Sequence, residues 1–300
     1  MKTLIIGLGN QGKKRKKNLN LDYVASVDPF NKDAEYEKIE HVDLKIYDSV
    51  MLCVPDNKKK ELIHYCLKNK KHILVEKPLN LKSSELKYME KLSKKNQTIL
   101  YTAYNHRFEP NFINVHKYLN KKTLGKFYSC KMFYGNGTSK LVKNSRWKDS
   151  KMGVISDLGS HLLDTVNYFL KIKPKNFDLI FKKKFENKSP DHALFIYRGK
   201  SLIQLEVSLC MWRNTFKCDL IFEKGSIHVD SLCKWGPSKF TIRHRKFPSG
   251  KPREINKTVI SPDPTWKKEY KYFKYLITNK INHGLSKDIW ISEVLANLEK

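Results

Sequence analysis

Up to about His116, short apolar runs alternate with longer segments in which apolar residues recur every three or four positions. The longer segments predict amphipathic helices, and the continuous apolar runs predict strands that are buried on both faces. This alternation is typical of a parallel sheet covered by helices. The predicted strands are residues 3–7, 23–28, 49–54, 72–75 and 98–103, and the predicted helices are residues 12–18, 58–70 and 83–95.

The pattern changes after about Lys121. One helix is predicted over residues 153–170, and the tail returns to helical spacing over 266–279 and 286–298. The remaining runs are rich in Val, Ile, Phe and Tyr and are separated by turn signals, which predicts a largely antiparallel sheet with strands at 127–134, 176–185, 192–197, 201–210, 217–223, 226–229 and 240–245. We therefore expect an α/β protein with two domains. Residues 1–118 form a doubly wound parallel sheet, and residues 119–300 form an α+β domain with an open, mostly antiparallel sheet.

Composition excludes several classes of protein. With 300 residues, 40% of them hydrophobic, the chain can bury two substantial cores, so we do not expect a disordered protein. Its longest apolar runs have the length of strands, far below the roughly 20 residues that span a bilayer. The first apolar run is followed by a basic stretch and no small-residue cleavage site, so we expect a cytoplasmic protein. Six scattered cysteines without a CxxC pair indicate reduced thiols and no structural metal site.

The chain carries 59 Lys and Arg residues against 30 Asp and Glu, and this excess raises the question of a polyanionic partner. The basic clusters recur along the whole chain and mostly flank predicted helices, for example at residues 13–17 and 58–60. Arginine, whose fork geometry suits phosphate, is scarce, and aromatic residues are not interleaved with the basic runs as nucleic-acid stacking requires. We interpret the clusters as solvated faces and expect neither a nucleic-acid nor a membrane partner.

A glycine-rich loop stands between the first predicted strand and a helix, and it reads Gly7-Leu8-Gly9-Asn10-Gln11-Gly12. In this GxGxxG pattern the first glycine permits a tight turn, the second admits a pyrophosphate, and the third lets helix and strand pack closely. Asp28 ends the second strand, where a carboxylate accepts hydrogen bonds from an adenosine ribose and repels a 2′-phosphate. These residues predict a dinucleotide cofactor, NAD in preference to NADP. NADP stays open because Lys32 or the basic stretch at 13–17 offers charge for a phosphate, and the alternative to a cofactor site is a plain glycine turn.

Glu76-Lys77-Pro78 stand at the carboxyl end of a predicted buried strand, at the edge of an α/β sheet where ligands bind. Burying a lysine is costly, so Lys77 at this place suggests a group that donates to a substrate hydroxyl or polarises a carbonyl oxygen. The alternative is that Glu76 and Lys77 begin an exposed loop.

A third signal is the segment from Asp157 to Asp164, which contains His161. On a helix these polar residues lie opposite an apolar stripe, and the histidine has one carboxylate four positions before it and another three positions after it. Such neighbours can orient an imidazole and tune its basicity for taking a hydroxyl proton during hydride transfer. The alternatives are a solvated helix surface and a metal site, although the metal site lacks the further His or Cys of a tetrahedral ligand set.

Taken together, these motifs resemble the glucose-fructose oxidoreductase, inositol dehydrogenase and MocA (Gfo/Idh/MocA) family. The resemblance covers residues 1 to about 170 and rests, in order, on GLGNQG, Asp28, Cys53-Val54-Pro55, Glu76-Lys77-Pro78, Asn105-His106-Arg107-Phe108 and DLGSHLLD. It implies an N-terminal Rossmann domain, a C-terminal substrate domain, and metal-independent hydride transfer between NAD(P) and a secondary hydroxyl or ketone carbon of a sugar, nucleotide sugar or cyclitol. It also implies a homodimer or homotetramer that associates through the open sheet.

The resemblance implies roles for individual residues as well. Lys77 binds and polarises the reacting oxygen, His161 is the acid/base with Asp157 beside it, and we expect Asp164 to orient His161. The residues expected at the substrate are Lys77, Asp157, His161, Asn105 and Arg107, and those expected at the cofactor are Gly7, Leu8, Gly9, Asn10, Gln11, Gly12, Asp28, Pro55, Glu76 and Lys77.

The chain departs from the family pattern in two places. The glycine-rich lead-in to the Asp157 motif is reduced to Lys151-Met152-Gly153, and Lys59 or Lys60 stands where members often carry a histidine. Fold by itself never proves catalysis, so the alternative function is a non-catalytic regulatory protein that binds a nicotinamide or a sugar on the same fold.

Overall fold

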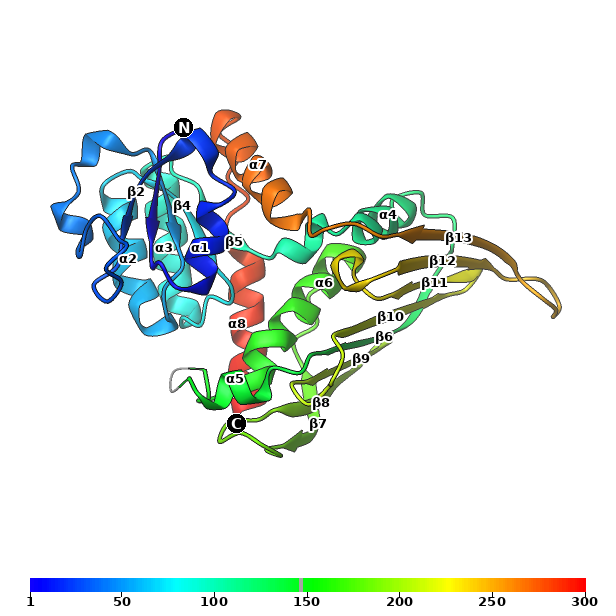
Figure 1. Ribbon diagram of the computed structural model, residues 1–300. Coiled ribbons are helices and arrows are strands. Elements are labelled where there is room, and N and C mark those ends of the chain that lie inside the picture. Colours follow the sequence, from blue (N-terminus) through cyan, green and yellow to red (C-terminus); the bar gives the residue numbers. More distant parts are fainter. Residues whose placement is uncertain (146–147) are drawn as a thin grey trace. The chain divides into compact units, whose positions relative to one another are not determined.

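The computed structural model describes residues 1–145 and 148–300, which form two compact units (Figure 1). The first unit contains residues 1–105 and 265–292, and the second contains residues 106–264 and 293–300. The expected boundary after residue 118 differs from this division in two places. Residues 106–118 group with the second unit, and residues 265–292 return to the first.

A five-stranded parallel sheet with the order β2-β1-β3-β4-β5 forms the first unit. The predicted alternation of strands and helices is confirmed, and each strand ends within two residues of the expected position. The strands are β1 (Thr3–Ile6), β2 (Tyr23–Val27), β3 (Ser49–Leu52), β4 (His72–Glu76) and β5 (Leu100–Ala103). The helices are α1 (Asn10–Lys16), α2 (Asp56–Lys68), α3 (Ser83–Lys95) and α7 (Thr265–Thr278), with short 3₁₀ turns at Asn20–Asp22, Ile39–His41 and Leu44–Ile46.

Both faces of this sheet are buried, as its continuous apolar strands require. Leu4 and Val50 belong to a core that side chains of α2 and α3 complete. Their neighbours along the same strands, Ile5 and Met51, belong to a second core that includes Phe273 of α7. Because α7 fills one face of the parallel sheet, it groups with the first unit although it lies near the carboxyl end of the chain.

The second unit contains an eight-stranded sheet with the order β13-β12-β11-β10-β6-β9-β8-β7 (Figure 1). Only β6 and β9 pair in parallel, and the other neighbouring strands are antiparallel, which confirms the predicted mostly antiparallel sheet. The strands are β6 (Phe127–Gly135), β7 (Phe177–Lys183), β8 (His192–Arg198), β9 (Leu202–Ser208), β10 (Thr215–Phe222), β11 (Gly225–Asp230), β12 (Ser238–His244) and β13 (Arg253–Val259). The helices are α4 (Pro110–Leu119), α5 (Ser139–Lys143) and α6 (Ser160–Leu170). Helix α8 (Ser286–Glu299) begins in the first unit and ends in the second. Short helical turns occupy Asn105–Phe108, Ile155–Gly159 and Cys233–Trp235.

Burial alternates along the strands of this sheet, as it does in β10, where Phe216 is fully buried and Lys217 is exposed. The ring of Phe112 on α4 lies 5.1 Å from that of Phe216 and 5.1 Å from that of Phe169 on α6, measured between ring centroids. These contacts place α4 and α6 over the buried face of the sheet. They also explain why residues 106–118 group with the second unit.

Three elements of the second unit were not predicted: α4, α5 and β13. Strand β13 is exposed at nearly every position, so it carries no apolar alternation for a sequence pattern to detect. It forms because β12 offers it an edge to pair with. In the part of the chain that the structure describes, no helix combines the length and the apolar character needed to cross a lipid bilayer.

Candidate functional site

The glycine-rich loop has the geometry that its sequence predicts. Gly7 has a φ of +89°, and a Cβ at this position would lie 2.5 Å from the backbone oxygen of Cys53, so another residue would be strained here. A Cβ on Gly12 would collide with the carbonyl oxygen of Gly7. Gly9 differs, because a Cβ there would meet nothing within 4 Å. Gly7 and Gly12 are therefore required by the fold, and Gly9 leaves open space beside the backbone, as the close approach of a pyrophosphate requires.

Asp28 lies directly beside this loop. One carboxylate oxygen accepts a hydrogen bond from the backbone N–H of Leu8 at 2.7 Å, and the other accepts from the N–H of Phe30 at 2.9 Å. The side-chain amide of Asn31 donates to the carbonyl of Leu8 at 2.9 Å, which ties residues 28–31 to the glycine-rich loop. Phe30 was not predicted as a site residue. Its side chain is 96% exposed next to Asp28, where an aromatic face is available to an adenine ring.

The carboxyl ends of the parallel strands bring together residues that are far apart in the sequence. In-register pairing of β1 with β2 and β3, and of β4 with β3 and β5, aligns these ends along one edge of the sheet. Gly7, Asp28, Cys53 and Lys77 each follow such a strand end. Pro55 precedes α2 as its N-cap residue. The first unit therefore gathers the predicted cofactor residues and Lys77 at the edge where open α/β sheets bind ligands.

We expected the basic clusters to lie on solvated faces, but two of their members are buried. Arg15 and Lys59 are 1% and 2% exposed, whereas Lys14 and Lys58 are exposed. The Arg15 guanidinium pairs with Glu76 and Glu269, and the Lys59 ammonium donates to the carbonyl of Pro78. Both cations therefore contact residues next to Lys77, which is itself partly buried.

Burial of charge perturbs the acid–base behaviour of this cluster. Burial raises the pKa of Glu269 to about 7, because the nearby Arg15 offsets only part of the cost of desolvation and Glu76 adds repulsion. Burial by itself lowers the pKa of Arg15, but Glu76 and Glu269 raise it above its usual value. The guanidinium therefore stays charged.

His161 lies in the second unit, in a cluster of aromatic rings. The helix predicted over residues 153–170 begins as a π-helical turn at Ile155–Gly159, a distortion often found at functional sites, and continues as α6. His161 is 6% exposed, and its ring stacks on that of His106 with centroids 4.1 Å apart and planes 19° apart. The Tyr134 ring meets the His161 ring edge-on at 5.9 Å. Asp157 is exposed, one helical turn earlier in the chain.

Asp164 binds an arginine. Its two carboxylate oxygens accept from Nε and Nη2 of Arg107 at 2.8 and 2.7 Å, and the guanidinium also lies 5.3 Å from the ring centroid of Tyr168. Such bidentate pairs are strong and directional. Arg107 is thereby anchored on α6, within the helix that carries His161. The orienting effect of Asp164 on His161 stays a prediction.

Asn105 is buried in the first unit, where its side-chain amide donates to the hydroxyl of Thr265 at 2.7 Å. His106 and Tyr134 are residues to which we assigned no role from the sequence. His106 stands inside the motif of residues 105–108, and that motif could have identified it as a site residue. Tyr134 lies 27 positions before His161 in the chain, and no local pattern identifies it. Burial raises the pKa of Tyr134 well above its usual value, so its hydroxyl stays protonated.

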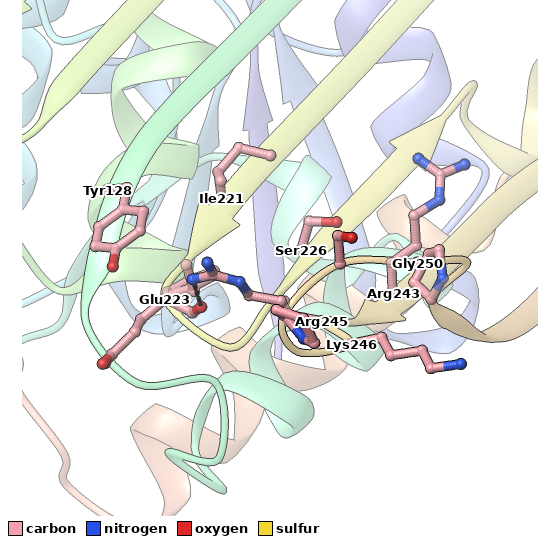
Figure 2. A pocket seen from close by; sticks show the side chains of 13 residues that line it. Tyr128, Ile221, Glu223, Ser226, Arg243, Arg245, Lys246 and Gly250 are labelled. Atoms are coloured by element: carbon pink, nitrogen blue, oxygen red, sulfur yellow. Dashed lines mark hydrogen bonds between the residues drawn. The ribbon is translucent and has the colours of Figure 1, made fainter.

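A pocket of about 440 Å³ lies elsewhere in the second unit, at the ends of β10, β11 and β12 (Figure 2). Arg243, Arg245 and Lys246 line it together with Glu223, and Arg245 donates to the carbonyl of Glu223 at 3.2 Å. None of the predicted site residues lines this pocket. Across residues 1–145 and 148–300, no three His, Cys, Asp or Glu side chains are grouped so that they can hold a metal ion.

The chain is similar to known dehydrogenases. Myo-inositol 2-dehydrogenase of Thermotoga maritima is 38% identical over 79 residues, which are 26% of this chain and 24% of that protein, so the match spans far less than the relative's whole length. Levoglucosan dehydrogenase in complex with NADH superposes with a TM-score of 0.84 at 14% identity, covering 100% of this chain and 96% of the other. UDP-N-acetylglucosamine 3-dehydrogenase from Acidithiobacillus ferrooxidans superposes with a TM-score of 0.80 at 16% identity, covering 99% of this chain and 95% of the other. At these low identities the structures establish the fold.

Two family models match successive parts of the sequence. Residues 1–104 match an oxidoreductase family with an NAD-binding Rossmann fold, and residues 112–228 match the Gfo/Idh/MocA C-terminal domain. The first match confirms the NAD-binding Rossmann domain that the glycine-rich loop and Asp28 predict. Because the two models belong to one family, follow each other in order and together cover more than half of the residues, the chain belongs to the Gfo/Idh/MocA oxidoreductase family.

Proposed function

We propose that this protein is an NAD(P)-dependent oxidoreductase that transfers a hydride between nicotinamide and a secondary hydroxyl or ketone carbon of a sugar, nucleotide sugar or cyclitol. One observation carries the proposal. The glycine-rich loop tied to Asp28, and Lys77 after β4, follow strands whose carboxyl ends align along one edge of the sheet. A dinucleotide cradle and an amine suited to a reacting oxygen are therefore presented on the same edge.

Each of the candidate residues has a proposed role in the hydride transfer. A nicotinamide held by the glycine-rich loop and Asp28 would supply the hydride-transfer chemistry. Lys77 donates a hydrogen bond to the oxygen on the reacting carbon and stabilises the negative charge that develops there. His161 takes the hydroxyl proton during oxidation and returns it during reduction, with Asp157 as a nearby carboxylate, so we propose that no metal ion is needed. Arg107 and Asn105 orient the substrate.

The substrate class follows from the relatives only in outline. One relative is named for an inositol and a structural neighbour for a UDP-sugar, so ring polyols with and without a nucleotide are both candidates. The net charge of +29 favours approach of a pyrophosphate-bearing substrate. We also propose that the protein assembles as a homodimer or homotetramer through the open face of the second sheet.

The test is a turnover assay that follows NADH absorbance with NAD and NADP against inositols, free sugars and nucleotide sugars. We expect one substrate class to reduce the cofactor. A protein that binds NADH but turns over no member of the panel would instead support the regulatory alternative. A protein that does not bind NADH would contradict the assignment of the cofactor residues.

Cofactor preference gives a separate prediction. Asp28→Asn keeps an acceptor for the N–H of Leu8 but removes the charge that repels a 2′-phosphate. We expect the ratio of kcat/KM for NADP to that for NAD to rise by about tenfold, which corresponds to roughly 1.4 kcal/mol. Asp33→Asn is the matched control, because it removes the same charge from an exposed position nearby. An equal rise in both variants would show a general charge effect and would contradict the role of Asp28.

A further inference from the structure

The segment Glu76-Lys77-Pro78 is held from both sides by buried cations. We propose that Arg15 and Lys59 are positioning residues that set the place of Lys77, Arg15 through the carboxylate of Glu76 and Lys59 through the carbonyl of Pro78. The inference rests on the proposed function, since it takes Lys77 as the amine that meets the reacting oxygen. The sequence does not single out Arg15, and it marks Lys59 only together with Lys60 as a departure from the family pattern, because each cation stands within a basic cluster whose other members are mostly exposed.

Arg15 connects three elements of the first unit. Its Nε donates to Glu76 Oε1 at 2.8 Å, its Nη2 lies 2.7 Å from the same oxygen, and its Nη1 donates to Glu269 Oε2 on α7 at 2.7 Å. The guanidinium also lies 4.2 Å from the ring centroid of Trp266. Arg15 is 1% exposed and Glu269 is fully buried, so these charge-assisted bonds are shielded from competing water. The end of β4 is thereby joined to α1 and α7.

Lys59 makes the second connection, from α2. Its Nζ donates to the carbonyl oxygen of Pro78 at 2.7 Å and lies 2.7 Å from Oδ1 of Asp56, one turn earlier on the same helix. Burial lowers the pKa of Lys59, and Asp56 opposes this shift. An ammonium this deeply buried is costly, and its two partners account for its tolerance. The neighbouring Lys60 is exposed and pairs with Glu85, so the two lysines differ in role although they are adjacent in the sequence.

The two connections act on either side of one residue. Glu76 immediately precedes Lys77, and Pro78 immediately follows it, so the backbone of Lys77 is anchored to α1 and α7 on one side and to α2 on the other. A reacting group displaced by about 1 Å can lose about a hundredfold in rate. Loss of the Lys59 anchor is therefore expected to reduce turnover more than cofactor binding, because its bonds connect α2 with Pro78 and involve neither the glycine-rich loop nor Asp28.

The test compares Lys59→Met with Lys60→Met. Methionine keeps the length of the side chain and removes its charge, so the pair separates the buried cation from its exposed neighbour. For Lys59→Met we expect kcat to fall by about ten- to a hundredfold with the NADH Kd within about twofold of the unmodified protein, and amide hydrogen exchange at residues 77 and 79 to accelerate. For Lys60→Met we expect no change in any of the three.

Glu76→Gln provides a second variant in case Lys59→Met does not fold. It keeps the shape of the side chain but replaces the ion pair with Arg15 by a neutral hydrogen bond, so the same changes are expected in smaller degree. Unchanged exchange at residues 77 and 79 in a folded Lys59→Met protein would overturn the proposal, and so would faster exchange with an unchanged kcat. If the unmodified protein turns over no substrate while exchange still responds to Lys59→Met, the anchoring of the segment is supported and the proposed function is what fails.

Discussion

Lys77→Met is expected to lower kcat by about 10²–10³-fold and to change the NADH Kd far less, because Lys77 is only one of ten residues expected at the cofactor. In the proposed mechanism the ammonium stabilises charge on the reacting oxygen in the transition state, and methionine fills nearly the same volume without a donor. Steady-state kinetics with the substrate identified by the panel, together with a fluorescence titration of NADH, measures both quantities. The loss should fall on kcat because the interaction strengthens as charge develops.

Lys87→Met on α3 is the control for this variant, since it removes one positive charge from an exposed position of the same unit. We expect its kinetics to match those of the unmodified protein. Equal losses in the two variants would point to the overall charge of the protein as the cause. A Lys77→Met protein with normal kcat would remove Lys77 from the mechanism and, with it, the purpose of the Arg15 and Lys59 anchors.

His161→Asn is expected to lower kcat for alcohol oxidation by about 10²–10⁴-fold, the usual contribution of a general base. In the proposed mechanism the imidazole takes the hydroxyl proton, and asparagine cannot replace it as a base. Steady-state kinetics with the substrate identified by the panel measures the loss.

His116→Asn is the matched control, because His116 also stacks on an aromatic ring of the second unit, that of Tyr168, with centroids 4.6 Å apart. The midpoint of thermal unfolding should be measured for both variants. His161 is buried against His106, so its replacement disturbs packing. A folded His161→Asn protein that keeps the kcat of the unmodified protein would show that another group accepts the proton.

Local sequence patterns predicted the strands of the parallel sheet and the glycine-rich loop well, because the apolar character of a strand and the conformation of a turn are properties of adjacent residues. Continuous apolar strands are compatible only with burial on both faces, and a φ of +89° at residue 7 excludes most residues other than glycine. Patterns missed α4 although its buried Phe112 packs on Phe216, and they missed β13, which has no apolar face of its own. Strand β13 is exposed along its length and depends on pairing with β12, which no local signal reports.

The sequence by itself determined the succession of strands and helices, the dinucleotide loop with Asp28, and the motifs that contain Lys77 and His161. Tertiary structure alone decided which of many similar residues are buried and paired. Arg15 and Lys59 look like their neighbours in two lysine-rich stretches, and only the folded chain shows them buried against Glu76 and Pro78. The same holds for α7 on the parallel sheet and for His106 and Tyr134 around His161. The physical reason is that burial and ion pairing arise between segments distant in sequence, whereas periodicity and turn geometry are properties of adjacent residues.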